Sequence, residues 1–179
     1  MKTKELVLLA LLIAMGAVLH IVVPPFIGGM KPDLLLIMMF LGIILFPRVG
    51  NVLLVGLAAG IISALTTGFP GGQIPNIIDK LVTAFIFFAL FIVLNKIAAH
   101  VATVTILTAI GTFISGMIFL GSAFILFGLP DAFLALATGV VLPAVGLNAV
   151  FMLIIYPIAL KLSGRLQLQA PSTQAVIKK

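Results

Sequence analysis

Long apolar runs, broken by short clusters of proline, glycine and charged residues, fill most of the 179-residue chain. Such clusters are typical of helix ends and turns. The pattern predicts six helices, near residues 5–23, 34–46, 52–67, 77–95, 101–127 and 143–162. The second helix, residues 34–46, is short: at about 1.5 Å per residue it spans only about 20 Å. We therefore expect it to tilt little, to thin the bilayer locally, or to recruit residues from its flanks.

The composition places these helices in a lipid bilayer. Hydrophobic residues make up 63% of the chain and charged residues only 8%, which is more apolar than a soluble protein of this length. A membrane-spanning helix needs about 20 apolar residues, so the six helices account for most of the chain. We predict an all-α polytopic membrane protein, with one domain of six transmembrane helices over residues 1–165 and a polar cytoplasmic tail over residues 166–179.

Residues that usually support catalysis or metal binding are scarce. The chain contains no cysteine and two histidines, and it lacks an HExxH motif and a phosphate-binding P-loop. We expect neither enzyme activity nor a cofactor in this chain. Its net charge of +6 comes from lysines and arginines scattered at the ends of apolar runs, without interleaved aromatic residues. Nucleic acid is therefore not an expected partner.

Positive charges on alternate sides of the apolar runs indicate the orientation. Of the ten Lys and Arg residues, Lys31 and Lys80 fall on one side of the predicted bundle and the other eight on the opposite side. Because cytoplasmic loops carry the excess of positive charge, both termini are predicted to be cytoplasmic in a protein of the plasma membrane. The outer connections are the longest and the richest in Gly and Pro, which favours a binding site built from them.

Two aspartates directly follow a proline at the start of a predicted helix. Proline is favoured at the first helical position, and a carboxylate in the first turn is stabilised by the positive end of the helix dipole. Asp33 and Asp131 are therefore interpreted as helix-capping residues. The segment over residues 131–142 is too short to span a membrane, and we expect an outer helical cap there that leads into the last helix.

Asp79 and Lys80 lie about one turn inside the fourth helix, where simple capping does not explain them. Neighbouring side chains diverge by about 100° around a helix, so we expect the two charges not to neutralise each other and each to need its own partner or a polar cavity. In one interpretation Lys80 reaches the headgroups and Asp79 pairs with Lys31. In the other, Lys80 binds the carboxylate and Asp79 the ammonium of a zwitterion.

Four stretches carry a resemblance to a known family. They read MKTKELV, GGMKPDLLLIMMFLGIILFPRVGNVL, GIISALTTGFPGGQIPNIIDK and LNAVFMLIIYPI. They are similar to the bacterial tryptophan transport protein family, TrpP, and the resemblance extends to about residue 162. That family in turn resembles the substrate-binding S components of energy-coupling factor (ECF) transporters, which have six helices, cytoplasmic termini and an outward-facing pocket. The resemblance implies a tryptophan-binding S component that captures tryptophan outside and delivers it inward.

The same resemblance implies partners. S components act with a transmembrane coupling subunit and two cytoplasmic ATPases, so ATP would be hydrolysed on those subunits. In those systems two alanines four residues apart on the first helix form the docking face for the coupling subunit, and Ala10 and Ala14 match that pattern. Small residues at this spacing let another helix approach closely in lipid. The alternative is a self-sufficient secondary permease for tryptophan or another small aromatic or vitamin substrate, with Asp79 and Lys80 as a proton relay.

Complementarity to tryptophan adds further candidate residues. An indole ring needs an apolar, aromatic enclosure and one acceptor for its N–H group. The polar candidates for this contact are Gln73, Asn76, Asn148 and Thr67. The aromatic candidates, on the predicted outer side, are Phe26, Phe69, Phe85 and Phe88.

Overall fold

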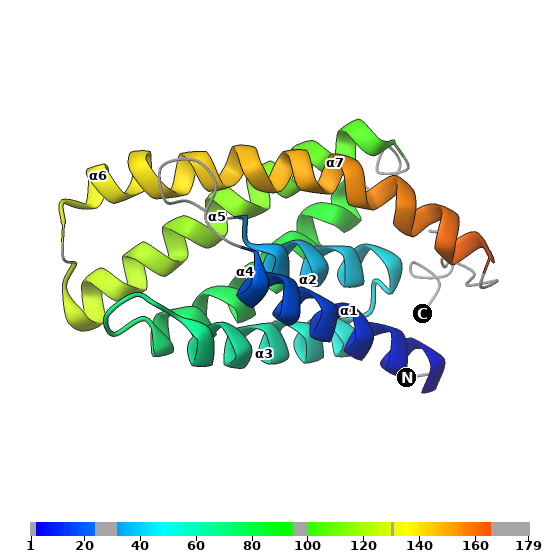
Figure 1. Ribbon diagram of the computed structural model, residues 1–179, viewed down its shortest axis with the longest axis horizontal. Coiled ribbons are helices and arrows are strands. Elements are labelled where there is room, and N and C mark those ends of the chain that lie inside the picture. The colour runs from blue at the N-terminus through cyan, green and yellow to red at the C-terminus, as the bar shows by residue number, and fades with distance from the viewer. Residues whose placement is uncertain (1–2, 24–31, 95–99, 130, 166–179) are drawn as a thin grey trace.

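The computed structural model describes residues 3–23, 32–94, 100–129 and 131–165. This part of the chain is all-helical with short connections, as the apolar pattern predicts (Figure 1). In chain order the helices are α1 (Thr3–Val22), α2 (Leu34–Leu45), α3 (Val49–Thr66), α4 (Gln73–Val93), α5 (Val101–Phe127), α6 (Phe133–Leu136), the π-helix η1 (Ala137–Val141) and α7 (Leu142–Arg165). The predicted tail over residues 166–179 lies outside the described residues.

Every predicted span corresponds to a helix, and the observed ends lie at most four residues from the predicted ones. The largest difference is at α4, which begins at Gln73 and so includes Pro75 in its first turn. Proline is tolerated there because the first backbone N–H groups of a helix have no intrahelical partner. Helical structure continues from α6 through η1 into α7, so the expected cap is helical and leads into the last span.

The two aspartates that follow prolines behave differently. Asp33 is the N-cap of α2, and its side chain accepts a hydrogen bond from the backbone N–H of Leu36, so its predicted capping role is confirmed. The same prediction is wrong for Asp131. Helix α6 begins at Phe133 with Ala132 as its N-cap, and no side chain caps it. Asp131 therefore precedes the helix and is exposed.

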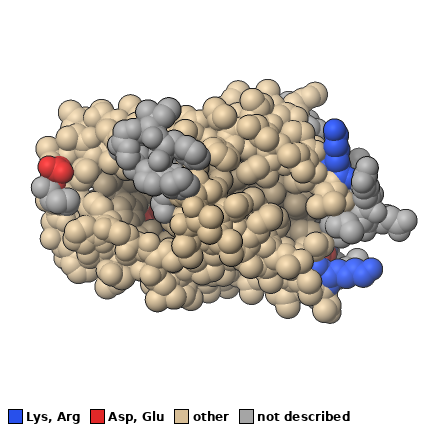
Figure 2. All heavy atoms as spheres, in the orientation of Figure 1, with Lys and Arg blue, Asp and Glu red and all other residues tan. Residues whose placement is uncertain are grey.

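The outer surface of the bundle is that of a multi-pass membrane protein. Helices α1, α3, α4, α5 and the continuous segment Phe133–Ser163 are long and apolar enough to cross a bilayer. Figure 2 shows that basic side chains gather at one end of the long axis, while most of the described atoms in the middle of this face belong to uncharged residues. The start of α1 and the end of α7 lie at that same end in Figure 1, here called the terminal end, and α6 lies at the opposite end.

The short helix α2 is enclosed by protein. Its sequence LLLIMMFLGIIL has no polar side chain, and every residue from Leu34 to Ile44 is buried. It contacts α1, α3, α4, α5 and α7. A helix that is apolar on all sides is stable where other apolar elements surround it. The expectation that α2 must adapt to the bilayer thickness is therefore wrong, since its neighbours shield it from lipid.

Helix α2 fills only part of the length of the bundle. In Figure 1 it runs from the middle of the bundle towards the terminal end, whereas α3, α4, α5 and α7 extend past its first residue towards α6. The aromatic core lies beside α2, where the rings of Phe40 and Phe87 stack with centroids 3.9 Å apart. The first turn of α2 thus faces a part of the bundle that α2 itself does not fill.

Gly111 of α5 is required where α5 meets this aromatic stack. A Cβ atom at Gly111 would lie 2.8 Å from atoms of both Phe40 and Phe87. We predict that Gly111→Val lowers the free energy of unfolding by about 1–3 kcal/mol because it overpacks the core. Thermal unfolding of the purified protein in detergent measures the loss. Gly121→Val on the same helix is the control, because a Cβ there meets no atom within 4 Å; equal losses in both variants would contradict the packing argument.

Candidate functional site

A cavity of about 390 Å³ lies between the first turn of α2 and the α6 end of the bundle. Its volume is in the range of small-molecule sites, roughly 300–1,000 Å³. Side chains from α1, α3, α4, α5, η1 and α7 line it, together with Asp33 at the start of α2. Because α2 begins in the middle of the bundle, its N-terminal end forms part of the cavity wall.

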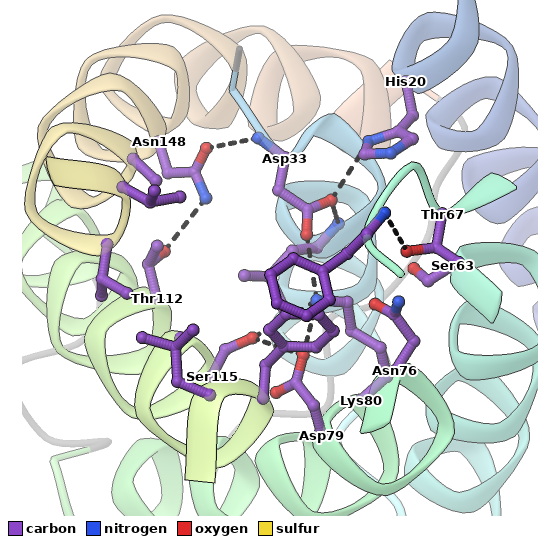
Figure 3. A pocket seen from close by; sticks show the side chains of 18 of the residues that line it. His20, Asp33, Ser63, Thr67, Asn76, Asp79, Lys80, Thr112, Ser115 and Asn148 are labelled. Atoms are coloured by element: carbon purple, nitrogen blue, oxygen red, sulfur yellow. Dashed lines mark hydrogen bonds and ion pairs between the residues drawn. The ribbon is translucent and has the colours of Figure 1, made fainter. Parts of the chain in front are cut away.

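Three charged side chains meet at this wall (Figure 3). The Lys80 Nζ atom lies 2.8 Å from Asp79 Oδ2 and 3.0 Å from Asp33 Oδ2. The same ammonium group donates to Ser115 Oγ at 3.3 Å. Lys80 of α4 therefore contacts residues on α4 and α5 and at the start of α2, and it joins the three elements through one buried charge. We call Asp33, Asp79 and Lys80 the charged cluster.

Asp79 is held almost entirely by the protein. Its Oδ2 atom accepts a hydrogen bond from Ser115 at 2.9 Å, and its Oδ1 atom accepts one from Thr83 at 2.9 Å. With the Lys80 contact these bonds satisfy a carboxylate that is only 1% exposed. A buried charge is tolerated when it is paired and hydrogen-bonded in this way.

The prediction that Asp79 and Lys80 do not neutralise each other is wrong. Their Cβ atoms leave the helix in different directions, but the four-carbon stem of lysine is long and flexible. It brings the ammonium group back to the neighbouring carboxylate at 2.8 Å. Lys31, the other partner considered for Asp79, lies outside the described residues.

A second polar connection joins α7 to the start of α2. The Oδ1 atom of Asn148 accepts a hydrogen bond from the backbone N–H of Asp33 at 2.8 Å, and its Nδ2 atom donates to Thr112 Oγ1 at 3.2 Å. His20 of α1 also lines the cavity, with Nδ1 3.4 Å from Asp33 Oδ1. Asp33 is therefore the point at which α1, α4 and α7 meet the first turn of α2.

The structure brings most of the predicted site residues together. The predicted site residues that line the cavity are Thr67, Phe69, Asn76, Asp79, Lys80 and Asn148. Gln73 does not line it, because it is exposed at the first turn of α4. Phe85 is exposed and Phe88 packs in the core, so neither forms the cavity wall. Phe26 lies outside the described residues.

Other cavity residues were not predicted as part of the site. Asp33 was interpreted only as a cap, although its other oxygen meets Lys80. Thr112 and Ser115 of α5 also line the cavity. Together with Thr108, which does not line it, they are buried and recur at spacings of four and three along the helix. That spacing places them on one helix face, so a polar stripe on an apolar helix was the signal that could have identified Thr112 and Ser115.

The part of the cavity nearer α6 is mainly apolar. The rings of Phe69 and Phe119 pack edge to face with centroids 5.2 Å apart, and both line the cavity. Val141 of η1 lies against Gly116 of α5, where a Cβ atom would clash with it. π-helical turns are frequent at functional sites. The cavity therefore combines a charged, hydrogen-bonding part with an aromatic and aliphatic part, the combination expected for an amphipathic small ligand.

We predict that Ser115→Ala destabilises the protein more than Ser122→Ala. Removal of the Ser115 hydroxyl takes one hydrogen bond from each ion of the Asp79–Lys80 pair, at a cost of about 1–3 kcal/mol. Ser122, on the same helix, bonds only to backbone carbonyls of its own helix, so its loss should cost less. Thermal unfolding in detergent compares the variants, and equal shifts would contradict a special role for Ser115.

Comparison with known proteins identifies the family of this chain. The family model described as Tryptophan transporter TrpP matches residues 2–163. A probable tryptophan transport protein of Bacillus subtilis (strain 168) is 61% identical over 158 residues, which cover 88% of this chain and 91% of that protein. One of Clostridium acetobutylicum is 45% identical over 166 residues, 92% of this chain and 96% of that protein. No solved structure matches the chain. The chain belongs to the tryptophan transporter TrpP family.

Proposed function

We propose that the chain binds tryptophan in this cavity and takes it up across the plasma membrane as the S component of an ECF-type transporter. One observation carries the proposal. In a chain of the TrpP family, a cavity of about 390 Å³ has opposite charges in one part and an aromatic pair in the other. An amino acid with a large ring has the same division between a zwitterionic and an apolar part.

The lining residues support a specific use of the cavity. Lys80 is the cation for the ligand carboxylate, and Asp79 holds Lys80 in place through their 2.8 Å contact. The indole ring packs against Phe69, since aromatic pairs and apolar enclosure favour it. Polar lining residues that offer an acceptor for the indole N–H are Thr67, Asn76 and Asn148.

The surface of α1 supports docking of a coupling subunit. Leu9, Ile13 and Gly16 face the core, whereas Ala10 and Ala14 are exposed. Small exposed residues four apart allow close approach of a second helix in lipid. The coupling subunit docks on this face, and its two ATPases supply the energy. Basic side chains are exposed at the terminal end of the bundle, which favours a cytoplasmic location for that end.

Binding is tested by titration of the purified protein with tryptophan. The chain contains no tryptophan, so the fluorescence of the ligand is observed without an indole background from the protein. We expect saturable binding, and a loss of at least about tenfold in affinity, about 1.4 kcal/mol, for Ala144→Leu, which places a larger side chain in the cavity. Ala135→Leu, at an exposed position of α6, is the control. No saturable binding by the unmodified protein would contradict the proposal.

Transport is tested in cells that lack other tryptophan uptake. We expect uptake only when the coupling subunit and ATPases are co-expressed. Replacement of both Ala10 and Ala14 by leucine should abolish uptake and preserve tryptophan binding, because it blocks docking and leaves the cavity unchanged. Ala102→Leu, an exposed alanine of α5, is the control. Uptake by the chain alone would favour the secondary permease and contradict the S-component assignment.

A further inference from the structure

The contact between Asp33 and Lys80 differs from the other contacts of the charged cluster. We propose that a bound amino acid opens this ion pair and inserts between its two members, with its ammonium group on Asp33 and its carboxylate on Lys80. The inference rests on the proposed binding of tryptophan in this cavity. It assigns Asp33, a helix cap at the cavity wall, as the residue that selects ligands with a free ammonium group.

The N–H donors of the Lys80 ammonium group already have polar partners within the protein. An ammonium group has three N–H donors, and those of Lys80 are directed to Asp79, Asp33 and Ser115. A ligand carboxylate can therefore bind Lys80 only if it displaces one of these three partners. The identity of the displaced partner decides which protein group is left for the other charge of the ligand.

Asp33 is the partner that can leave. Asp79 precedes Lys80 on the same helix, is 1% exposed and keeps two hydroxyl donors of its own. The Asp33 side chain is 24% exposed and belongs to a different element. Its Oδ1 atom stays occupied by the Leu36 N–H, so only Oδ2 has to change its partner.

Opening the pair leaves a charge that must be compensated. A charge that loses its partner inside a membrane protein is costly, and the partly buried Asp33 would lose its Lys80 contact. A zwitterion replaces one ion pair by two and leaves the net charge of the cluster unchanged. A ligand that has a carboxylate but no ammonium group leaves Asp33 Oδ2 without a replacement for Lys80. It also adds a second excess negative charge, because the cluster already holds two carboxylates and one ammonium.

The test compares three indole ligands: tryptophan, tryptamine, which lacks the carboxylate, and indole-3-propionate, which lacks the ammonium group. All three fluoresce, and the chain has no tryptophan. The variant Asp33→Asn removes the charge but keeps the cap, because asparagine is an equally good N-cap. Asp131→Asn, at an exposed position outside the cavity, is the control.

In the unmodified protein we expect tryptophan to bind at least about tenfold more tightly than indole-3-propionate, because indole-3-propionate leaves the partly buried Asp33 without its cationic partner. Asp33→Asn should weaken tryptophan and tryptamine by at least a similar factor. It should leave indole-3-propionate unchanged or bound more tightly, because Lys80 no longer has a competing carboxylate. The control should match the unmodified protein.

Two results would overturn the inference. One is equal affinity of the unmodified protein for tryptophan and indole-3-propionate, a comparison that needs no variant and holds even if Asp33→Asn fails to fold. The other is a folded Asp33→Asn protein that binds tryptophan with unchanged affinity. In both cases tryptophan still binds, so the proposed function survives. Absence of tryptophan binding in the unmodified protein would instead contradict the proposed function, and this inference with it.

Discussion

The site depends on the contacts of the Lys80 ammonium group with Asp33, Asp79 and Ser115. Inside a membrane protein a charge must find partners, and Lys80 finds them at the start of α2, on α4 and on α5. The position of each of these elements is therefore constrained by the others. Asn148 extends the constraint to α7, because it bonds both to the backbone of Asp33 and to Thr112. A set of apolar helices thus acquires a defined polar surface at one depth of the bundle.

The length of α2 follows from the same arrangement. A helix that crossed the whole bundle would occupy the space that the cavity takes. Because α2 begins at Leu34, in the middle of the bundle, its capping carboxylate lines the cavity. Asp33 consequently serves two purposes. One oxygen caps the helix, and the other contacts a cation, the ammonium group of Lys80.

Most of the fold could be predicted from the sequence because it depends on local patterns. Apolar runs give the helices, and proline and glycine clusters give their ends. The capping role of Asp33 follows from the same local rules, and Asp79 and Lys80 stand out because charge is rare in such a chain. The sequence of α2 also indicated its location inside the bundle, because the helix has no polar side. Its short length led instead to the expectation that it adapts to the thickness of the bilayer.

The remaining parts of the site depend on contacts between distant segments. Nothing near Asp33 in the sequence indicates that Lys80, 47 positions later, or Asn148 approaches it. The divergence of neighbouring side chains around a helix also led to a wrong expectation for Asp79 and Lys80. It describes the direction of each Cβ atom but not the length of the lysine side chain, which reaches back to Asp79. Ser115 was missed for a third reason, because serines in membrane helices usually bond to their own backbone, as Ser122 does.

The central claim is that the charged cluster binds the ammonium and carboxylate groups of an amino acid, in addition to holding the helices together. A structure of the protein determined with bound tryptophan tests it most directly. We predict the ligand ammonium within hydrogen-bond distance of Asp33 and the ligand carboxylate at Lys80, with the Asp79–Lys80 contact retained. A structure in which tryptophan is bound elsewhere while Asp33 and Lys80 remain in contact would contradict the account.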